Sequence, residues 1–92
     1  MLEDEILGNL YQKFPVTIEK GLGSHVWDVD GNEYIDCMGA YGVAITGYRN
    51  QRVNNAIKNQ IDKIISVHSS FYNKTRENFL ETILKIAPKN LS

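Results

Sequence analysis

The stretch that decides the fold covers residues 25–38 and reads His25-Val26-Trp27-Asp28-Val29-Asp30-Gly31-Asn32-Glu33-Tyr34-Ile35-Asp36-Cys37-Met38. Runs of β-prone residues lie on both sides of the short segment Asp30-Gly31-Asn32. The Asp-Gly pair supplies the positive φ that a tight hairpin turn requires. The pattern therefore predicts a β-hairpin.

The residues before the hairpin predict a helix and a short β segment. The helix is indicated by apolar residues at helical spacing: Leu2, Ile6, Leu7, Leu10 and Tyr11. We expect Phe14-Pro15 to end it, because the residue before proline is disfavoured in the α region. Val16-Thr17-Ile18 is typical of a strand, and Gly21-Leu22-Gly23 of a flexible link.

A glycine-rich segment follows the hairpin at residues 39–48, with glycines at Gly39, Gly42 and Gly47. It is typical of a loop with tight turns and close backbone packing. The same composition also suits a surface where a ligand or a second chain approaches the backbone.

Two amphipathic helices are predicted after this loop. Asn50 is the N-cap of the first. Its apolar stripe consists of Val53, Ala56, Ile57, Ile61, Ile64 and Ile65, and the polar Gln60 falls on the same stripe. Asn73 or Thr75 caps the second, and Pro88 closes it. The stripe of the second helix is Phe79, Leu80, Ile83, Leu84 and Ala87.

The composition excludes several classes of protein. The chain has 92 residues, 42% of them hydrophobic, and a net charge of -1, which argues against a disordered tail and a nucleic-acid footprint. No apolar run approaches the ~20 residues of a membrane-spanning helix. The acidic N-terminus and the single Cys37 indicate a reducing, cytoplasmic setting. We expect an α+β chain that is a single small domain or depends on a partner.

Motifs for nucleotide and metal binding fail on inspection. Gly21-x-Gly23 lacks the third glycine and leads into a strand, so it is no dinucleotide loop. A calcium loop starting at Asp28 would need glycine at position 33 and glutamate at position 39, where Glu33 and Gly39 stand. His25, His68 and Cys37 lack zinc-ligand spacing. We therefore expect no metal site.

No catalytic set is complete. Cys37 is expected to be a small core residue of a strand. Asp28 and Asp36 face each other across the hairpin, with no sign of burial or of a raised pKa. Asn73-Lys74-Thr75 matches a glycosylation pattern, but helix capping explains it better.

The order of the segments resembles the opening of class III pyridoxal-phosphate aminotransferases. In that family a lysine-glycine-x-glycine stretch precedes a hairpin with the motif tryptophan or tyrosine, aspartate, x, x, glycine, x, x, tyrosine, x, aspartate, as residues 20–36 do here. The sequence is most similar to acetylornithine aminotransferases, and residues 67–77 favour the archaeal branch that acts on lysine or ornithine held by the carrier protein LysW. It departs from the family at Tyr48 and Gln51, where histidine and proline are usual.

The resemblance implies an enzyme that uses pyridoxal phosphate to transfer an amino group from an acetylornithine, ornithine or LysW-lysine donor to 2-oxoglutarate. It implies a homodimer of fold-type I, an α/β fold, in which residues 1–48 form part of the small domain and residues 49–92 lead toward the large one. The cofactor lysine lies beyond this chain, so we expect no catalytic or cofactor-binding residue here and no activity of the segment alone.

Substrate contacts are the only site residues that carry over from the family. Tyr41 matches a position that lines the substrate entrance in ornithine-type relatives, and Phe71 or Tyr72 matches an aromatic residue near the active site. For these side chains, packing and dimer contact are the alternatives.

Two other functions stay open from the residues alone. One is a truncated relic or structural module without catalysis, whose apolar stripe at residues 53–65 would cover a partner. The other is a self-sufficient small α+β binding domain.

Overall fold

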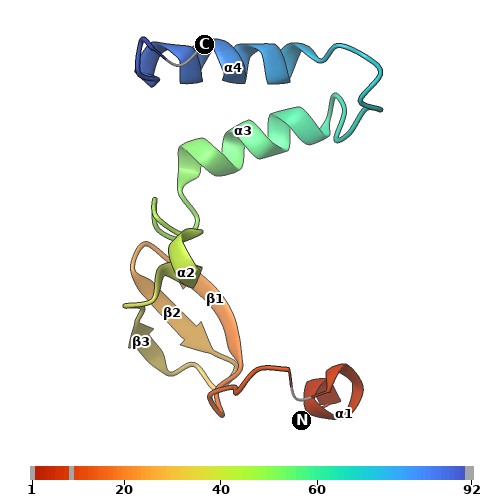
Figure 1. Ribbon diagram of the computed structural model, residues 1–92. Helices are drawn as coiled ribbons and strands as arrows, with labels where there is room; N and C mark the ends of the chain where they lie inside the picture. Colours follow the sequence, from red (N-terminus) through yellow and green to blue (C-terminus); the bar gives the residue numbers. More distant parts are fainter. Residues whose placement is uncertain (1, 9, 91–92) are drawn as a thin grey trace. The chain divides into compact units, whose positions relative to one another are not determined.

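The computed structural model describes residues 2–8 and 10–90. The elements in chain order are α1 (Leu2–Leu7), β1 (Ile18–Leu22), β2 (His25–Asp28), β3 (Glu33–Ile35), α2 (Gly39–Gly42), α3 (Gln51–Ile61) and α4 (Lys74–Ile86) (Figure 1). The chain divides into two compact units, residues 1–54 and 55–92. The expected α+β segment with a small antiparallel sheet and several helices is confirmed.

The sheet of the first unit is an antiparallel meander in the order β1-β2-β3. Trp27 pairs with Glu33 and Val26 with Tyr34, which confirms the predicted hairpin. On the other side of β2, Leu22 pairs with His25 and Gly21 with Val26, and a register shift lies between Ile18 and Lys20. The central strand β2 therefore holds both neighbours through its backbone.

The aspartate that begins the hairpin turn organises it through its carboxylate. Asp28 Oδ1 accepts hydrogen bonds from the backbone N–H groups of Asp30 (3.0 Å) and Asn32 (2.8 Å). Gly31 has a φ of 85°, the positive value that the Asp-Gly pair predicts. The expectation that neither hairpin aspartate is buried is wrong for Asp28, which is only 6% exposed. Burial is tolerated because the carboxylate is hydrogen-bonded.

The elements before the hairpin differ from the prediction in their bounds. The N-terminal helix α1 ends at Leu7, where Gly8 takes a left-handed φ of 71°, so glycine and not Phe14-Pro15 ends it. Leu10 and Tyr11 lie outside the helix. The strand β1 begins only at Ile18, and the expected flexible link Gly21-Leu22 belongs to it. Pairing with β2 decides this, because backbone hydrogen bonds outweigh the low strand propensity of glycine.

The segment after β3 contains a turn of left-handed backbone. Residues Gly39, Ala40, Tyr41 and Gly42 of α2 have φ values of 58°, 49°, 57° and 88°. Such values are ordinary for glycine but uncommon for Ala40 and Tyr41. The turn is therefore held in place by what surrounds it.

The two long helices begin at the predicted caps. Asn50 Oδ1 accepts a hydrogen bond from Val53 N (3.1 Å), and Asn73 Oδ1 accepts one from Arg76 N (2.9 Å). Of the two candidates for the second cap, the structure selects Asn73. α4 ends at Ile86, and Ala87 before Pro88 is extended, as predicted. α3 ends at Ile61, so Ile64 and Ile65 lie beyond it.

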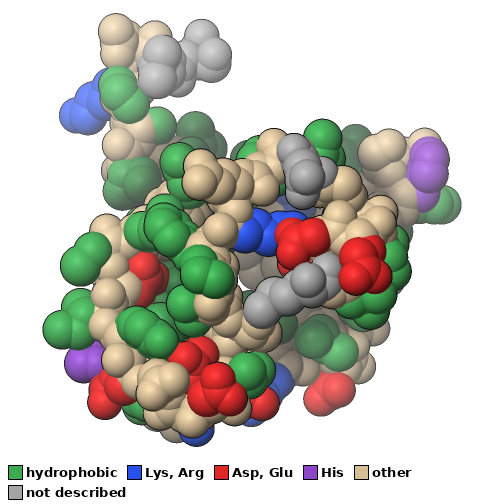
Figure 2. Space-filling model, turned by 90° about the horizontal axis from the view of Figure 1, so that it is seen from below, with side chains coloured by type: hydrophobic (Ala, Val, Ile, Leu, Met, Phe, Trp, Pro, Cys, Tyr) green, Lys and Arg blue, Asp and Glu red, His purple; other side chains and the backbone are tan. Residues whose placement is uncertain are grey.

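Little apolar surface is buried in the part of the chain that the structure describes. Val26 is its one buried hydrophobic residue. The stripes of α3 and α4 are exposed, with Ile57 at 52% and Phe79 at 60%. Figure 2 shows hydrophobic side chains spread over the visible face among acidic and basic ones. Among the described residues, no helix has the length and hydropathy to span a membrane.

Candidate functional site

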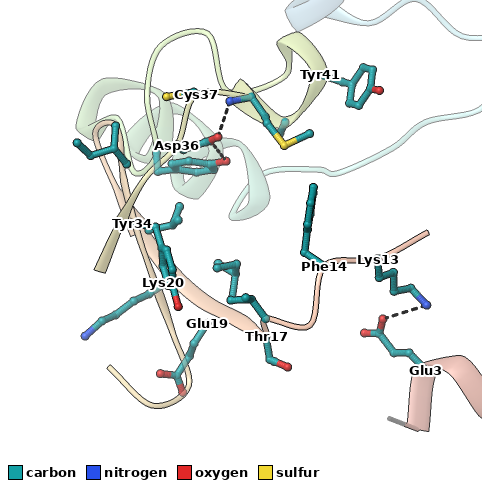
Figure 3. A pocket seen from close by; sticks show the side chains of 18 of the residues that line it. Glu3, Lys13, Phe14, Thr17, Glu19, Lys20, Tyr34, Asp36, Cys37 and Tyr41 are labelled. Carbon is teal, nitrogen blue, oxygen red and sulfur yellow. Dashed lines mark hydrogen bonds and ion pairs between the residues drawn. The ribbon is translucent and has the colours of Figure 1, made fainter. Parts of the chain in front are cut away.

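A hollow lies within the first unit, beside the sheet (Figure 3). Its volume is about 1160 Å³. Apolar side chains line it, among them Phe14, Ile18, Val26, Ile35 and Met38. The lining comes from strands β1, β2 and β3, from the segment before β1, and from α2 with the residues just before it. It is thus a surface suited to packing rather than to acid–base chemistry.

The basic groups around the hollow are engaged in pairs. Lys13 Nζ lies 3.2 Å from Asp4 Oδ1 and 3.9 Å from Glu3 Oε2. The hydrogen bond from Lys13 lowers the pKa of Asp4. Lys20 Nζ lies 5.7 Å from the centre of the Trp27 ring, within the range of a cation–π contact. Both lysines are exposed and each already has a partner.

One tyrosine–aspartate pair lies at the hairpin turn. The Tyr34 hydroxyl donates to Asp28 Oδ2 at 2.9 Å, and Asn32 Nδ2 donates to the same oxygen at 3.0 Å. The side-chain hydrogen bond from Asn32 is the main cause that lowers the pKa of Asp28. The bond to Asp28 raises the pKa of Tyr34. With these donors and a lowered pKa, the carboxylate of Asp28 is a weak base at neutral pH.

A second tyrosine–aspartate pair closes the glycine-rich segment. Asp36 Oδ1 accepts from the N–H groups of Met38 (2.8 Å) and Gly39 (3.2 Å), while Asp36 Oδ2 accepts from the Tyr48 hydroxyl at 2.5 Å. Figure 3 shows Asp36 next to the hollow, with hydrogen bonds to its carboxylate drawn as dashed lines. The bond from Tyr48 lowers the pKa of Asp36, and the same bond raises the pKa of Tyr48.

The backbone of Tyr48 is tied to the turn between β1 and β2. Gly23 N donates to Tyr48 O at 2.9 Å, and Tyr48 N donates to Gly23 O at 2.8 Å. The Tyr48 ring lies against Gly21, where an added Cβ would fall 2.7 Å from Tyr48 Cγ. The strand therefore needs glycine at this position, because any side chain would occupy the space of the ring.

Of the three predicted substrate residues, Tyr41 lies in the first unit. It belongs to α2, and its side chain contributes to the lining of the hollow while 94% of the residue is exposed. Figure 3 shows the ring projecting from the α2 ribbon. Within the described residues its hydroxyl makes no hydrogen bond, so it is available to an incoming group.

Phe71 and Tyr72 lie in the second unit, directly before α4. Arg76 Nη2 donates to the carbonyl of Phe71 at 2.8 Å, and Phe71 N donates to the carbonyl of His68 at 3.0 Å. Both side chains are exposed, Phe71 at 64% and Tyr72 fully. Tyr72 also lines a second, smaller hollow of about 420 Å³ together with Arg76.

The fold corrects one sequence expectation on a reactive group. Cys37 was expected in the core of a strand, but β3 ends at Ile35 and Cys37 is exposed. The strand stops early because the Asp36 carboxylate takes the N–H groups of Met38 and Gly39. Across residues 2–8 and 10–90, no three His, Cys, Asp or Glu side chains gather as a metal site.

The link from Asp36 to Tyr48 and the approach of Tyr48 to Gly21 were missed by the sequence reasoning. Twelve residues separate the two hydrogen-bonded side chains, and no local pattern pairs them. The only signal was that Tyr48 stands where the resembling family has histidine.

Comparison with known proteins identifies a family whose sequence profile the chain matches. The profile of the family described as aminotransferase class-III matches residues 6–92. The acetylornithine aminotransferase of Methanopyrus kandleri is 35% identical over 91 residues, which are 99% of this chain and 23% of that protein. The LysW-aminoadipate semialdehyde transaminase of Deinococcus radiodurans is 34% identical over 82 residues, 89% of this chain and 19% of that protein.

The fold agrees with a solved structure of the same kind. The crystal structure of acetylornithine aminotransferase from Elizabethkingia anophelis matches with a TM-score of 0.88 and 28% sequence identity, over 92% of this chain and 22% of that chain. The chain thus spans less than a quarter of the length of each of these relatives.

Proposed function

We propose, from the premise that this chain belongs to the class-III aminotransferase family, that it is the N-terminal segment of an amino-acid aminotransferase. The complete enzyme transfers an amino group from an acetylornithine, ornithine or LysW-bound donor to 2-oxoglutarate. The segment supplies the small antiparallel sheet and substrate-side contacts, and it has no transferase activity alone.

The observation that carries the proposal is the family match over residues 6–92, combined with a physical role for both aspartates, the glycine and the tyrosine of the hairpin motif. Asp28 binds the turn and accepts from Tyr34. Gly31 provides the positive φ, and Asp36 accepts from the residues that follow the hairpin. These contacts explain why the family motif needs these residue types at this spacing.

Pyridoxal phosphate supplies the electron sink of such a reaction, but the residues of this chain do not fit it. The cofactor is held by a lysine whose amine is activated by a desolvated or cationic environment. All seven lysines of the chain are exposed. Lys13 is paired with the carboxylate of Asp4. No residue of this segment is therefore assigned to the cofactor.

The role proposed for this chain is to shape the substrate side of the pocket. Tyr41 offers an unpaired phenol on an exposed ring that can donate to a donor carboxylate or pack against its aliphatic stem. Phe71 or Tyr72, exposed in the second unit, is proposed separately as a substrate contact from the family resemblance. These residues orient the donor, and none of them takes part in proton transfer.

The partners in the proposal follow the relatives. The amino donor is a free amino acid or one that is carried by LysW, and the enzyme is a cytoplasmic homodimer. We place residues 1–48 in its small domain, with residues 49–92 leading toward its large one. The exposed apolar faces of α3 and α4 agree with this, because such faces are stable in water only when other protein covers them.

The test uses the longer polypeptide that carries this segment, purified with pyridoxal phosphate. Amino transfer to 2-oxoglutarate is measured with acetylornithine, ornithine and a LysW-bound donor. We expect glutamate formation with at least one of the three. A folded enzyme that is inactive with all of them would refute the proposal and would favour a structural module.

The inactivity of the segment is tested separately. The 92-residue chain is mixed with pyridoxal phosphate and the same donors, with the longer polypeptide as the positive control. We expect no glutamate above the level of a control without the chain. Turnover by the short chain would contradict the assignment of the cofactor site to other residues.

A further inference from the structure

The segment between Asp36 and Tyr48 is closed like a loop at its base. At one end Asp36 holds the N–H groups of Met38 and Gly39, and at the other the backbone of Tyr48 is paired with Gly23 of the sheet. The hydrogen bond from the Tyr48 hydroxyl to Asp36 Oδ2 joins the two ends. Both side chains are half-buried, so the bond is partly shielded from water.

The loop that this bond closes carries the left-handed turn of α2. Ala40 and Tyr41 lie in a backbone region that residues with a Cβ rarely adopt. A strained turn persists only where the surrounding structure over-determines it. Asp36 supplies part of that constraint directly, because it accepts from the N–H of Gly39, the first residue of the turn.

The ring of Tyr48 is also held from the side of the sheet. The absence of a side chain at Gly21 leaves the space that the ring occupies. Ring, hydroxyl and backbone of Tyr48 therefore each have a fixed partner, whereas the phenol of Tyr41 has none among the described residues. Three contacts of residue 48 therefore fix the base of the loop, and the tip of the loop is exposed.

We propose that Asp36 and Tyr48 are positioning residues that hold the turn at residues 39–42 so that Tyr41 is presented to the amino donor. The proposal rests on the proposed function, since it takes Tyr41 as a substrate contact. Tyr48 acts through its hydroxyl, which joins the ends of the loop, and it does not touch the substrate. Histidine at this position would offer a shorter side chain and a group that titrates near neutral pH, so tyrosine gives a bond that persists across that range.

The experiment is a double-mutant cycle in the longer enzyme with its cofactor. Tyr48→Phe removes the hydroxyl and keeps the ring against Gly21. We expect the KM for the amino donor to rise about 3- to 10-fold, the range for loss of one net hydrogen bond, with kcat changed by less than about twofold. The KM for 2-oxoglutarate gives a second readout.

The cycle separates positioning from a general loss of structure. In a Tyr41→Ala background, Tyr48→Phe should produce no further rise in KM, because the residue that it positions is gone. Tyr34→Phe is the matched control: it removes the other tyrosine–aspartate bond of the sheet, at the hairpin turn, and should leave both kinetic constants near those of the parent enzyme. Equal KM effects of Tyr48→Phe with and without Tyr41 would overturn the proposal.

A second variant covers the case in which Tyr48→Phe does not fold. Gly21→Ala displaces the Tyr48 ring from the sheet side without substituting Asp36, Tyr41 or Tyr48. It should reproduce the rise in KM, and an unchanged KM would count against the proposal. If the parent enzyme transfers amino groups but the cycle is additive, only this inference fails. If the parent enzyme is inactive with every donor, the proposed function fails first.

Discussion

Gly21→Ala is the substitution for which the structure gives the most definite expectation. An added Cβ would lie 2.7 Å from Cγ, 2.9 Å from Cβ and 3.1 Å from Cδ2 of Tyr48, whereas ordinary contact begins at 3.4 Å. The ring would have to retreat by about 0.7 Å to restore contact distance. It cannot do so freely, because two backbone hydrogen bonds to Gly23 and the bond to Asp36 hold it.

The magnitude follows from two opposing effects. Overpacking of this kind costs about 1–3 kcal/mol. Replacing glycine by alanine returns about 0.4–1 kcal/mol through the unfolded chain, since the φ of Gly21 is not positive. We therefore expect a net loss of about 1–2 kcal/mol in the free energy of unfolding of the sheet.

The assay is urea unfolding followed by the fluorescence of Trp27, the one tryptophan of the chain, which lies in β2 beside β1. At a slope of about 1 kcal/mol per molar urea, the midpoint should fall by about 1–2 M. In a Tyr48→Ala background the loss should shrink, because the contacts with the ring carbons are gone. A Gly21→Ala chain as stable as the parent would refute the assumption that Tyr48 is fixed in place.

Four further predictions follow from the cap of α4, the hairpin turn, the two carboxylates and Tyr48. Asn73→Ala should destabilise α4 by about 0.5–2 kcal/mol, measured as lost helical circular dichroism on heating, because Arg76 N loses its acceptor; Asn78→Ala, inside the same helix, is the control and should cost less. Gly31→Ala should cost about 1–2 kcal/mol in the same urea assay because its φ is 85°, and the cost is purely conformational, since nothing lies within 4 Å of the added Cβ. An unchanged midpoint would show that the turn relaxes. The pKa values of Asp28 and Asp36 are lowered by folding, so their contribution to stability is present above pH 3.8 and is lost as the pH falls below it. The pKa of Tyr48 is raised above 10.0, so its contribution is lost as the pH rises through the folded value; Tyr48→Phe should flatten this alkaline decline, and an identical decline in the variant would contradict the assignment.

Local chemistry explains which parts of the fold could be predicted. The hairpin around Gly31 and the cap at Asn50 depend on residues within a few positions of each other, and both are confirmed; of the two candidates for the second cap, the structure has Asn73. The start of β1 at Ile18 could not be predicted in the same way. It is set by pairing with β2, and pairing depends on residues that local propensity does not include.

The candidate site, too, could be predicted from the sequence only in part. Tyr41 was identified from the sequence through a family resemblance, and its role stays a proposal. The contacts that hold its loop join Asp36 to Tyr48 and Tyr48 to Gly21, over twelve and twenty-seven residues of chain. No periodicity or motif encodes such pairs.

The sequence by itself thus determined the hairpin, the two capped helices and the family resemblance, because each is written in short-range turn, capping and motif chemistry. Only the tertiary structure decided that Asp28 is buried, that Cys37 is exposed and that Tyr48 closes the loop of Tyr41. The physical reason is that burial and long-range hydrogen bonds depend on which strands lie side by side. That arrangement is a property of the whole sheet and not of any one segment.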